Sequence, residues 1–497
     1  MQQKHDADIV VVGGGTAGAV CAIAAARLGL HTILVEKTGM IGGVAATTLM
    51  GSFANLAVTT EHEPLLGGLV TEIIARLVAC GATPYHSLQD ALHSTIDAPF
   101  TIPFLPIYYT KILTDMLRES SATVFLDSVF IGGQEIAHKK QLLFACGSTR
   151  FTVDATVAVD ATGNADVAAA IGAPVNEGVS SHGCLMRIGG VDIEKTFAYI
   201  KEAKPWEPDA TFAPWLREKL GIGKDEKIPF CRHLLDPLSY DHAPMETRED
   251  TLLTPKRFEY IEKRWKGEGI FYNIELNLLR KKIRTATDHG DFILNQIIAP
   301  GQGITFNGDG IAYGAWGEGV ALCNVAKPYG FHAENPQEST RASLEALQYN
   351  FMMFAFFKKY VPGFENSALL DMGSQTISRV GRTICGCEDL PATPEHAVFT
   401  TPIYLFGGVY AFWQGDAVPY GRIVCREYDN LFAVGKCSSK GFSFRSQLSC
   451  MSMGVAAAAA AKVIQDTQCT AHSMPADALR RQLKTMCVIL EKEHANA

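Results

Sequence analysis

The sequence lacks several patterns that mark common chemistries. No cysteines form a CxxC pair, which excludes a thioredoxin-like redox pair and a zinc ribbon. No run of clustered Lys and Arg occurs and the formal net charge is −8, so we expect no nucleic-acid or anionic-membrane partner. No His, Asp, Glu and Cys cluster has metal-site spacing, and no GxSxG marks a nucleophile elbow. We therefore expect no bound metal.

The composition is that of a globular protein. The 497 residues suggest roughly two to four domains, and 47% hydrophobic with 19% charged residues argues against disorder. Thirteen scattered cysteines suit a reducing compartment, so we expect a cytoplasmic protein. The closest pair, Cys385-Gly386-Cys387, is either a redox or metal pair or a strand with small buried thiols, and we favour the strand.

One charge-free stretch, residues 9–26, has the length of a marginal membrane span or a signal peptide. Three glycines interrupt its apolar start, and Asp6 and Asp8 precede it where a leader needs basic residues. No other segment is expected to approach a span, so we predict no membrane crossing.

The strongest motif lies in the first forty residues. An apolar, β-branched run at 8–12 predicts a strand buried on both faces. It enters Gly13-Gly14-Gly15-Thr16-Ala17-Gly18, which satisfies GxGxxG, and an Ala-rich helical segment at 19–28 follows. A second strand at 32–35 ends at Glu36. This order of elements is what the motif requires for dinucleotide binding, as opposed to a merely structural turn.

Each part of the motif has a physical role. Gly13 permits the tight turn, Gly15 lets a pyrophosphate approach the backbone, and Gly18 lets the helix pack closely. The unpaired N–H groups of the helix start, at residues 16 and 17, face the phosphate charge. Glu36 is placed to accept ribose hydroxyls and disfavours a 2′-phosphate, so NAD or FAD is expected and not NADP.

Three further segments resemble flavoproteins. Lys37-Thr38-Gly39-Met40-Ile41-Gly42-Gly43 resembles the segment after the ribose acid in glutathione reductase-type enzymes. The strand that ends in Ala161-Thr162-Gly163 follows a strand-rich stretch at 124–153, with Gly132-Gly133 as a turn, which fits their β-meander. Residues 430–436 resemble the last strand beneath the ribityl chain, and the helix expected at 447–464 would stabilise negative charge at the flavin N1–O2 edge. The resemblance implies FAD contacts by Lys37, Gly42, Gly43, Val129, Ala161, Thr162, Gly163, Gly435 and Lys436.

The chain is similar to the bacterial FAD-dependent oxidoreductase family, whose FAD domain resembles fumarate reductase flavoproteins. The motifs that carry this likeness lie at 189–195, 361–366, 379–384, 418–422 and 435–461. Family members usually carry Glu-Ser where this chain has Val380-Gly381. In the fumarate reductase group a His soon after the Gly-Gly can carry the flavin, whereas residues 44–50 contain none, so noncovalent FAD is expected.

We predict an α/β fold, a Rossmann-like FAD-binding domain with an inserted β-meander and an inserted α+β substrate domain. The predicted FAD domain comprises residues 1–60, 120–185 and 376–470, with a helical insertion at 61–119, a substrate domain at 186–375 and a helical tail at 471–497.

Periodicity predicts four helices outside the FAD domain. Apolar residues from Val70 to Val78 predict a helix closed by Gly81. The segments 255–267 and 271–283 also have helical spacing. A helical stripe formed by Leu344, Leu347, Phe351, Phe354 and the Met352-Met353 pair is expected to be core and less favoured as a substrate pocket.

Arg379 and Arg382 are the leading catalytic candidates, because a planar guanidinium can clamp a carboxylate or a developing enolate near flavin N5. The alternative is that both pair with acids or phosphate in the FAD domain. Arg445, just before the C-terminal alanine helix, is expected to contact flavin or substrate.

Weaker candidates are histidines and pocket residues. His182 and His233 have the chemistry of proton donors, although a lone His is more often an ordinary core residue. Tyr313, Trp316 and Glu318 lie in a glycine-rich stretch and are candidates for lining a pocket.

No second GxGxxG follows a strand, so a built-in NAD(P)H domain is not expected. We therefore predict an enzyme that transfers a hydride between FAD and a small organic substrate, with an unidentified separate electron acceptor or donor. Two alternatives stay open, a flavin monooxygenase and a non-catalytic or tRNA-associated FAD-binding protein.

Overall fold

The computed structural model describes the chain in parts. The described residues are 3–54, 67–83, 85, 87–93, 101–192, 195–196, 211, 214–215, 218, 272–275, 303–306, 319–323, 329–388, 397–402, 415–438 and 446–490.

The central sheet is the predicted parallel sheet. Its order is β5-β2-β1-β8-β7-β6, and β21 also pairs with β8. The parallel strands are β1 (Gln3–Val12), β2 (Thr32–Val35), β5 (Thr123–Phe125), β8 (Thr149–Asp160) and β21 (Leu431–Ala433). Ile9, Val10 and Val11 are fully buried, which explains their unbroken apolar run.

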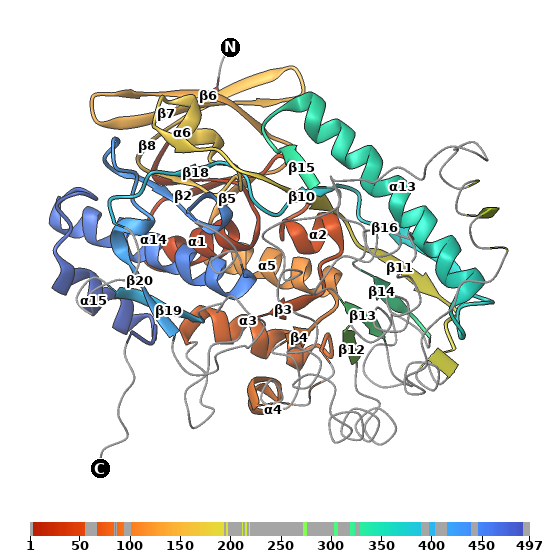
Figure 1. Ribbon diagram of the computed structural model, residues 1–497. Helices are drawn as coiled ribbons and strands as arrows, with labels where there is room; N and C mark the ends of the chain where they lie inside the picture. Colours follow the sequence, from red (N-terminus) through yellow and green to blue (C-terminus); the bar gives the residue numbers. More distant parts are fainter. Residues whose placement is uncertain are drawn as a thin grey trace.

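Helices cover the two faces of this sheet. Ile9 and Val11 share one apolar cluster with α1 (Thr16–Arg27) and α14 (Gln447–Thr467), which lie close together near the middle of Figure 1. Val10 belongs to a second cluster with α6 (Asp166–Ala170) on the opposite face. A Cβ at Gly454 of α14 would lie 2.3 Å from the Ala17 carbonyl oxygen, so the small residue permits the close approach of α1 and α14.

The β-meander is present, but its predicted turn is wrong. β6 (Val129–Ile136), β7 (Lys139–Cys146) and β8 pair antiparallel in succession, at the top of Figure 1. Gly132 and Gly133 lie within β6, where the register with β7 shifts. The chain reverses at Ala137 and His138, which have φ angles of 48° and 64°. Sequence reasoning chose the glycines because they adopt positive φ at no steric cost.

A second, antiparallel sheet lies in the chain segment predicted as the substrate domain. Its order is β12-β13-β14-β11-β16, with β12 (Tyr272–Glu275), β13 (Gly303–Phe306), β14 (Ala321–Cys323), β11 (Met186–Gly189) and β16 (Ala368–Met372). β12 corrects the helix predicted over 271–283, because pairing with β13 overrides the local helical period. The segment 255–267 lies outside the described residues.

The long helix α13 (Pro336–Tyr360) lies at the edge of the molecule in Figure 1. Met352 and Met353 are buried as expected, but Leu344 is 63% exposed and Phe351 56% exposed. The core prediction for those two residues is wrong. The helix turns a different face inward, formed by Ala342, Ala346, Asn350, Met353 and Phe357.

The remaining elements are short. The predicted helix over Val70–Val78 is confirmed as α3, and Gly81 follows it with a φ of 68°. A three-stranded sheet of order β15-β10-β17 contains β15 (Tyr329–His332), β10 (Val179–Gly183) and β17 (Ile377–Ser378). The other helices are α2 (Val44–Thr48), α3 (Gly68–Ala79), α4 (Leu88–His93), α5 (Pro106–Ser120) and α15 (Ala476–Thr485). The other strand pairs are β3 (Ser52–Ala54) with β4 (Thr101–Pro103), β9 (Val175–Asn176) with β18 (Thr383–Ile384), and β19 (Ala397–Pro402) with β20 (Gly415–Pro419).

Two sequence expectations need correction. Besides residues 9–26, α14 is also long and apolar enough to cross a membrane, which the sequence analysis did not expect. In the structure, 94% of the most apolar window of α14 is buried within the fold. Cys387 is exposed and Cys385 is half-buried, and Gly386 between them forms only an isolated bridge with Cys425. The Cys-Gly-Cys segment is therefore not a strand of buried thiols.

Candidate functional site

The carboxyl ends of four parallel strands meet at one edge of the central sheet. β1 leads into Gly13, β2 into Glu36, β8 into Ala161 and β21 into Val434 and Gly435. This edge is where open α/β sheets bind their ligands. The structure thus brings together the segments that the sequence predicts to bind a dinucleotide.

The glycine loop is shaped by close backbone approaches. Gly13 has a φ of 107°, and a Cβ there would lie 2.4 Å from the Ala161 carbonyl oxygen. Gly43 has a φ of 54°, and its Cβ would lie 2.7 Å from the Gly15 Cα. The Gly42 N–H donates to the Gly14 carbonyl oxygen over 2.9 Å. Gly42-Gly43 therefore packs directly against the loop, as its place in the motif predicts.

The start of α1 is open to an anion. Its N-cap is Gly15, which has no side chain to cap the first N–H groups. The Thr16 hydroxyl points elsewhere, toward Gln447 at the start of α14 and Tyr109 of α5. Gly435 covers Ala17, because a Cβ on Gly435 would lie 3.1 Å from the Ala17 Cβ. These backbone N–H groups and the helix dipole favour a phosphate here.

Glu36 is buried, with 7% of its surface exposed. One carboxylate oxygen accepts a 2.5 Å hydrogen bond from the Gly14 N–H. The other accepts from the N–H and the hydroxyl of Thr38, each over 2.8 Å. These three contacts fix the carboxylate beside the glycine loop. Because a carboxylate has about four lone-pair sites, about one remains to accept a hydrogen bond from a ribose hydroxyl. Lys37, next to Glu36, is exposed. Val129 is also exposed, and it follows Ser128, whose N–H donates to the Glu36 carbonyl oxygen over 3.0 Å.

The Ala161-Thr162-Gly163 turn is held by the buried carboxylate of Asp160. Asp160 accepts hydrogen bonds from Thr162 and from the backbone N–H groups of Val167 and Ala168 at the start of α6. Burial raises the pKa of Asp160, and the Ala168 and Thr162 donors oppose that rise. The turn is therefore rigid, and its backbone borders the glycine loop at Gly13.

Lys436, in the segment that follows β21, is hydrogen-bonded to β17. Its Nζ donates to the Ser378 carbonyl oxygen over 3.0 Å and to the Ser378 hydroxyl over 2.5 Å. His182 lies directly opposite Ser378 in the β10–β17 register. Burial, followed by the charge of Lys436, lowers the pKa of His182 to about 4. The imidazole is neutral at neutral pH, which argues against the predicted proton-donor role.

The two candidate arginines differ in their surroundings. Arg382 donates from Nε to the Asn164 carbonyl oxygen over 3.1 Å and from Nη2 to Asp166 over 2.8 Å. The contact with Asp166 is the pairing with an acid that was predicted as the alternative to a catalytic role. Arg379 is half-buried and directly follows Ser378. A substrate role of either arginine stays a prediction.

Close packing explains why Gly381, between these two arginines, is a glycine. A Cβ on Gly381 would lie 2.2 Å from the Asn164 Oδ1 and 3.4 Å from the Lys436 Nζ. The serine usual in the family therefore does not fit this backbone unless Asn164 moves.

The residues around this edge fit a polar, adenine-linked nucleotide. Eight buried side-chain nitrogen and oxygen atoms have no partner within the part of the chain that the structure describes, and three of them lie around this edge, namely Thr110 Oγ1, Asn164 Oδ1 and His182 Nε2. Thr110 borders Gly42, Asn164 follows the Gly163 turn, and His182 lies beside Lys436. Buried polar atoms without partners are costly, and a hydroxylated ligand would satisfy them.

Sequence reasoning missed Thr110, Asn164 and Ser378 as neighbours of the site. Asn164 had a signal, since it directly follows the Ala-Thr-Gly turn. Thr110 lies on α5 and Ser378 on β17, and only the fold brings them here. His233, Tyr313, Trp316, Glu318 and Arg445 lie outside the described residues.

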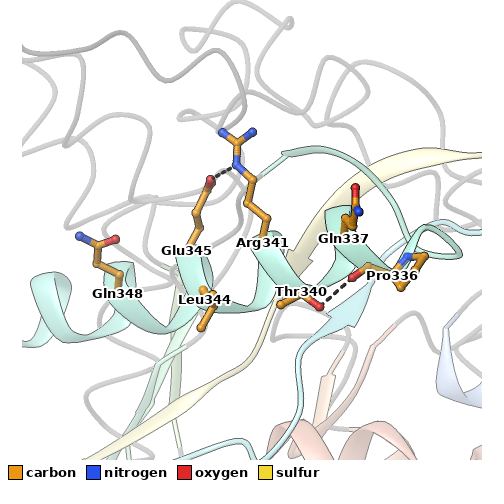
Figure 2. Close-up of a pocket in the computed structure, with 7 residues that line it drawn as sticks. All are labelled: Pro336, Gln337, Thr340, Arg341, Leu344, Glu345 and Gln348. Carbon is orange, nitrogen blue, oxygen red and sulfur yellow. Dashed lines mark hydrogen bonds and ion pairs between the residues drawn. The ribbon is translucent and has the colours of Figure 1, made fainter.

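The structure also contains a potential metal-ligand group and a pocket. Glu177, His332 and Glu334 bring potential metal-ligand atoms within 4.8 Å of one another, a grouping that sequence spacing did not predict. A pocket of about 590 Å³ lies along α13. Arg341 pairs with Glu345 there (Figure 2). The residues that line this pocket are all on α13, Pro336, Gln337, Thr340, Arg341, Leu344, Glu345 and Gln348.

The fold and this edge define a Rossmann-like nucleotide-binding protein of the flavoprotein type. The family model described as "FAD dependent oxidoreductase" matches residues 8–392 and 410–483. The chain belongs to this family, and it is an FAD-dependent oxidoreductase with FAD as its cofactor. The family resemblance predicted from the sequence is confirmed.

Curated relatives match only a short part of the chain. Mitochondrial dihydrolipoyl dehydrogenase of Caenorhabditis elegans is 58% identical over 39 residues, 8% of this chain and 8% of that protein. The tRNA uridine 5-carboxymethylaminomethyl modification enzyme MnmG of Treponema pallidum is 41% identical over 63 residues, 12% of this chain and 10% of that protein. The match thus spans about a tenth or less of either relative.

Two solved structures align with nearly the whole chain but at low identity. A geranylgeranyl bacteriochlorophyll reductase-like protein of Thermoplasma acidophilum has a TM-score of 0.41 and 13% identity, covering 97% of this chain and 83% of its own. A p-nitrophenol 4-monooxygenase of Pseudomonas putida has a TM-score of 0.40 and 8% identity, covering 97% and 84%.

Proposed function

We propose that this protein transfers a hydride between noncovalently bound FAD and a carbon of a small organic substrate. The observation that carries the proposal is the meeting of four strand ends with the Ser378–Arg382 loop at one edge of the sheet. When bound, the flavin supplies the hydride chemistry, and the protein supplies orientation, charge and exclusion of water.

The residues of this chain divide the binding task. The open start of α1 holds the pyrophosphate, and Glu36 accepts the ribose hydroxyls. The start of α14, capped by Ser446, faces negative charge at the flavin pyrimidine. Arg379, next to Ser378 and Lys436, binds an anionic group of the substrate, while Arg382 is held by Asp166.

The binding is proposed to be noncovalent because residues 44–50 offer no histidine to the flavin. The antiparallel sheet with α13 is proposed as the substrate domain, roughly residues 186–375. Scattered cysteines, all unpaired within the described parts of the chain, support a cytoplasmic location. The electron acceptor or donor is proposed to be a separate molecule.

A reductive titration tests the function. Purified protein is mixed anaerobically with organic acids, sugars, steroids and amines, and bleaching of the flavin absorbance reports hydride transfer from a substrate. NADPH oxidation with and without oxygen tests the monooxygenase alternative, since coupled hydroxylation needs both. RNA retention at low salt tests the tRNA-associated alternative. MnmG, to which a short part of this chain is similar, is a tRNA modification enzyme. Oxygen-dependent NADPH turnover with hydroxylated product would replace the proposal.

A further inference from the structure

His182 of β10 and Lys436, which follows β21, both neighbour Ser378 of β17. His182 and Ser378 are directly opposite each other in antiparallel register, so their side chains lie on the same face of the pair. The Lys436 ammonium reaches the same point, because its Nζ donates to both the carbonyl and the hydroxyl of Ser378. A side chain from the end of β21 thus borders the imidazole.

The tautomer of His182 follows from its contacts. The imidazole makes a hydrogen bond to the backbone of Phe331, and Nε2 has no partner among the described residues. The bond to Phe331 therefore uses Nδ1, which carries the hydrogen and leaves a lone pair on Nε2. The ring also meets the Phe331 ring edge-on, with centroids 6.2 Å apart. His182 is 2% exposed, so water does not reach this lone pair freely.

We propose that His182 is a cofactor-binding residue whose Nε2 accepts a hydrogen bond from a hydroxyl of the ribityl chain of FAD, beside a donor from Lys436. A hydroxyl is the group that suits this pair, because it donates to the imidazole and accepts from the ammonium. Lys436 follows Gly435 at the carboxyl end of β21, and its Cε would lie 3.6 Å from a Cβ on Gly163. Lys436 therefore lies beside the Ala161-Thr162-Gly163 turn, which borders the glycine loop at Gly13. The inference depends on FAD binding and not on hydride transfer.

The test is a binding cycle between protein variants and cofactor analogues. FAD is removed from the full chain and restored as FAD, 2′-deoxy-FAD, 3′-deoxy-FAD or 4′-deoxy-FAD, with the dissociation constant read from flavin fluorescence. The proteins are wild type, His182→Leu, His182→Gln and His5→Leu. His5 is a matched control, because its Nε2 is also buried without a described partner, but it lies toward the amino end of β1 opposite Val153.

In wild type, one deoxy analogue is expected to bind about tenfold more weakly than FAD, the usual size of a lost buried hydrogen bond. His182→Leu should bind FAD about tenfold more weakly and lose the penalty for that analogue, while His182→Gln keeps an acceptor and part of the affinity. His5→Leu should behave as wild type.

Equal FAD affinity in wild type and His182→Leu would overturn the inference, and it would mean that water satisfies Nε2. A deoxy penalty that persists undiminished in His182→Leu would also overturn it. If His182→Leu fails to fold by circular dichroism, the analogue series is repeated on His182→Phe, which also lacks a hydrogen-bond acceptor. An FAD affinity equal to that of wild type, or an undiminished deoxy penalty in that variant, contradicts the contact. The binding cycle does not depend on catalysis. A protein that binds FAD as expected but turns over no substrate would contradict the proposed function and leave this inference standing.

Discussion

The buried imidazole of His182 should make the folded protein less stable at acid pH, and this can be measured. Burial, and then the Lys436 charge, lowers its pKa to about 4, while the Phe331 backbone and Glu338 oppose the shift. An unfolded chain binds this proton near the ordinary pKa of about 6.5. Protonation therefore favours unfolding, so the contribution of His182 to stability is full above pH ~6.5 and is lost as the pH falls toward 4.

The size of the effect follows from the shift. One pKa unit corresponds to about 1.4 kcal/mol, so the free energy of unfolding should fall by about 3 kcal/mol through His182 between pH ~6.5 and ~4. The assay is urea unfolding by circular dichroism at saturating FAD, at half-unit steps from pH 7.5 to 4.5. His182→Gln keeps a polar side chain that does not titrate, and His31→Gln, on the exposed loop before β2, is the control.

The His182→Gln variant should lose stability less steeply than wild type, by about 1.4 kcal/mol per pH unit between pH ~6 and ~4.5. His31→Gln should keep the wild-type slope. The reasoning is refuted if the slopes of His182→Gln and wild type coincide in this window, because the imidazole would then titrate alike in the folded and unfolded chains.

Four further predictions concern the nucleotide edge. Glu36→Ala should weaken FAD binding by at least about tenfold in a fluorescence titration, and unchanged flavin occupancy would remove Glu36 from the ribose site. Gly43→Ala should lose flavin and lower the urea midpoint, because the new Cβ would lie 2.7 Å from a neighbouring Cα at a positive φ; a flavin-replete variant of normal stability would contradict this. Arg379→Ala should keep flavin and lose about 100-fold in turnover, and flavin loss would assign Arg379 to the cofactor. Arg382→Ala should also break the half-exposed pair with Asp166, at a cost in unfolding free energy of less than about 1 kcal/mol.

The sequence predicted the parts of the site that are continuous in the chain. The GxGxxG loop, its flanking strands and Glu36 form one βαβ unit, whose geometry depends on local residues and short connections. Ala161-Thr162-Gly163 and Gly435 were predicted from their resemblance to flavoprotein motifs, and the structure places each after a strand of the same sheet.

What the sequence did not predict depends on register and on long-range packing. The neighbours His182, Ser378 and Lys436 come from three distant segments. The β10–β17 pairing brings His182 and Ser378 together, and the end of β21 adds Lys436. The Ala137-His138 turn carries no glycine or asparagine signal.

The inward face of α13 was also beyond local reasoning. Two faces of this helix carry apolar residues, and tertiary packing chose the one with Ala342 and Ala346 over the one with Leu344. Periodicity alone does not distinguish such faces.

The central claim is that FAD lies along the crevice at the carboxyl edge of this sheet, bound without a covalent bond. The direct measurement is acid precipitation of freshly purified protein, followed by the absorbance and chromatography of the supernatant. The account predicts yellow protein that releases close to one equivalent of intact FAD and leaves a colourless pellet. A colourless protein that takes up no FAD on incubation, or flavin that stays with the pellet, would contradict it.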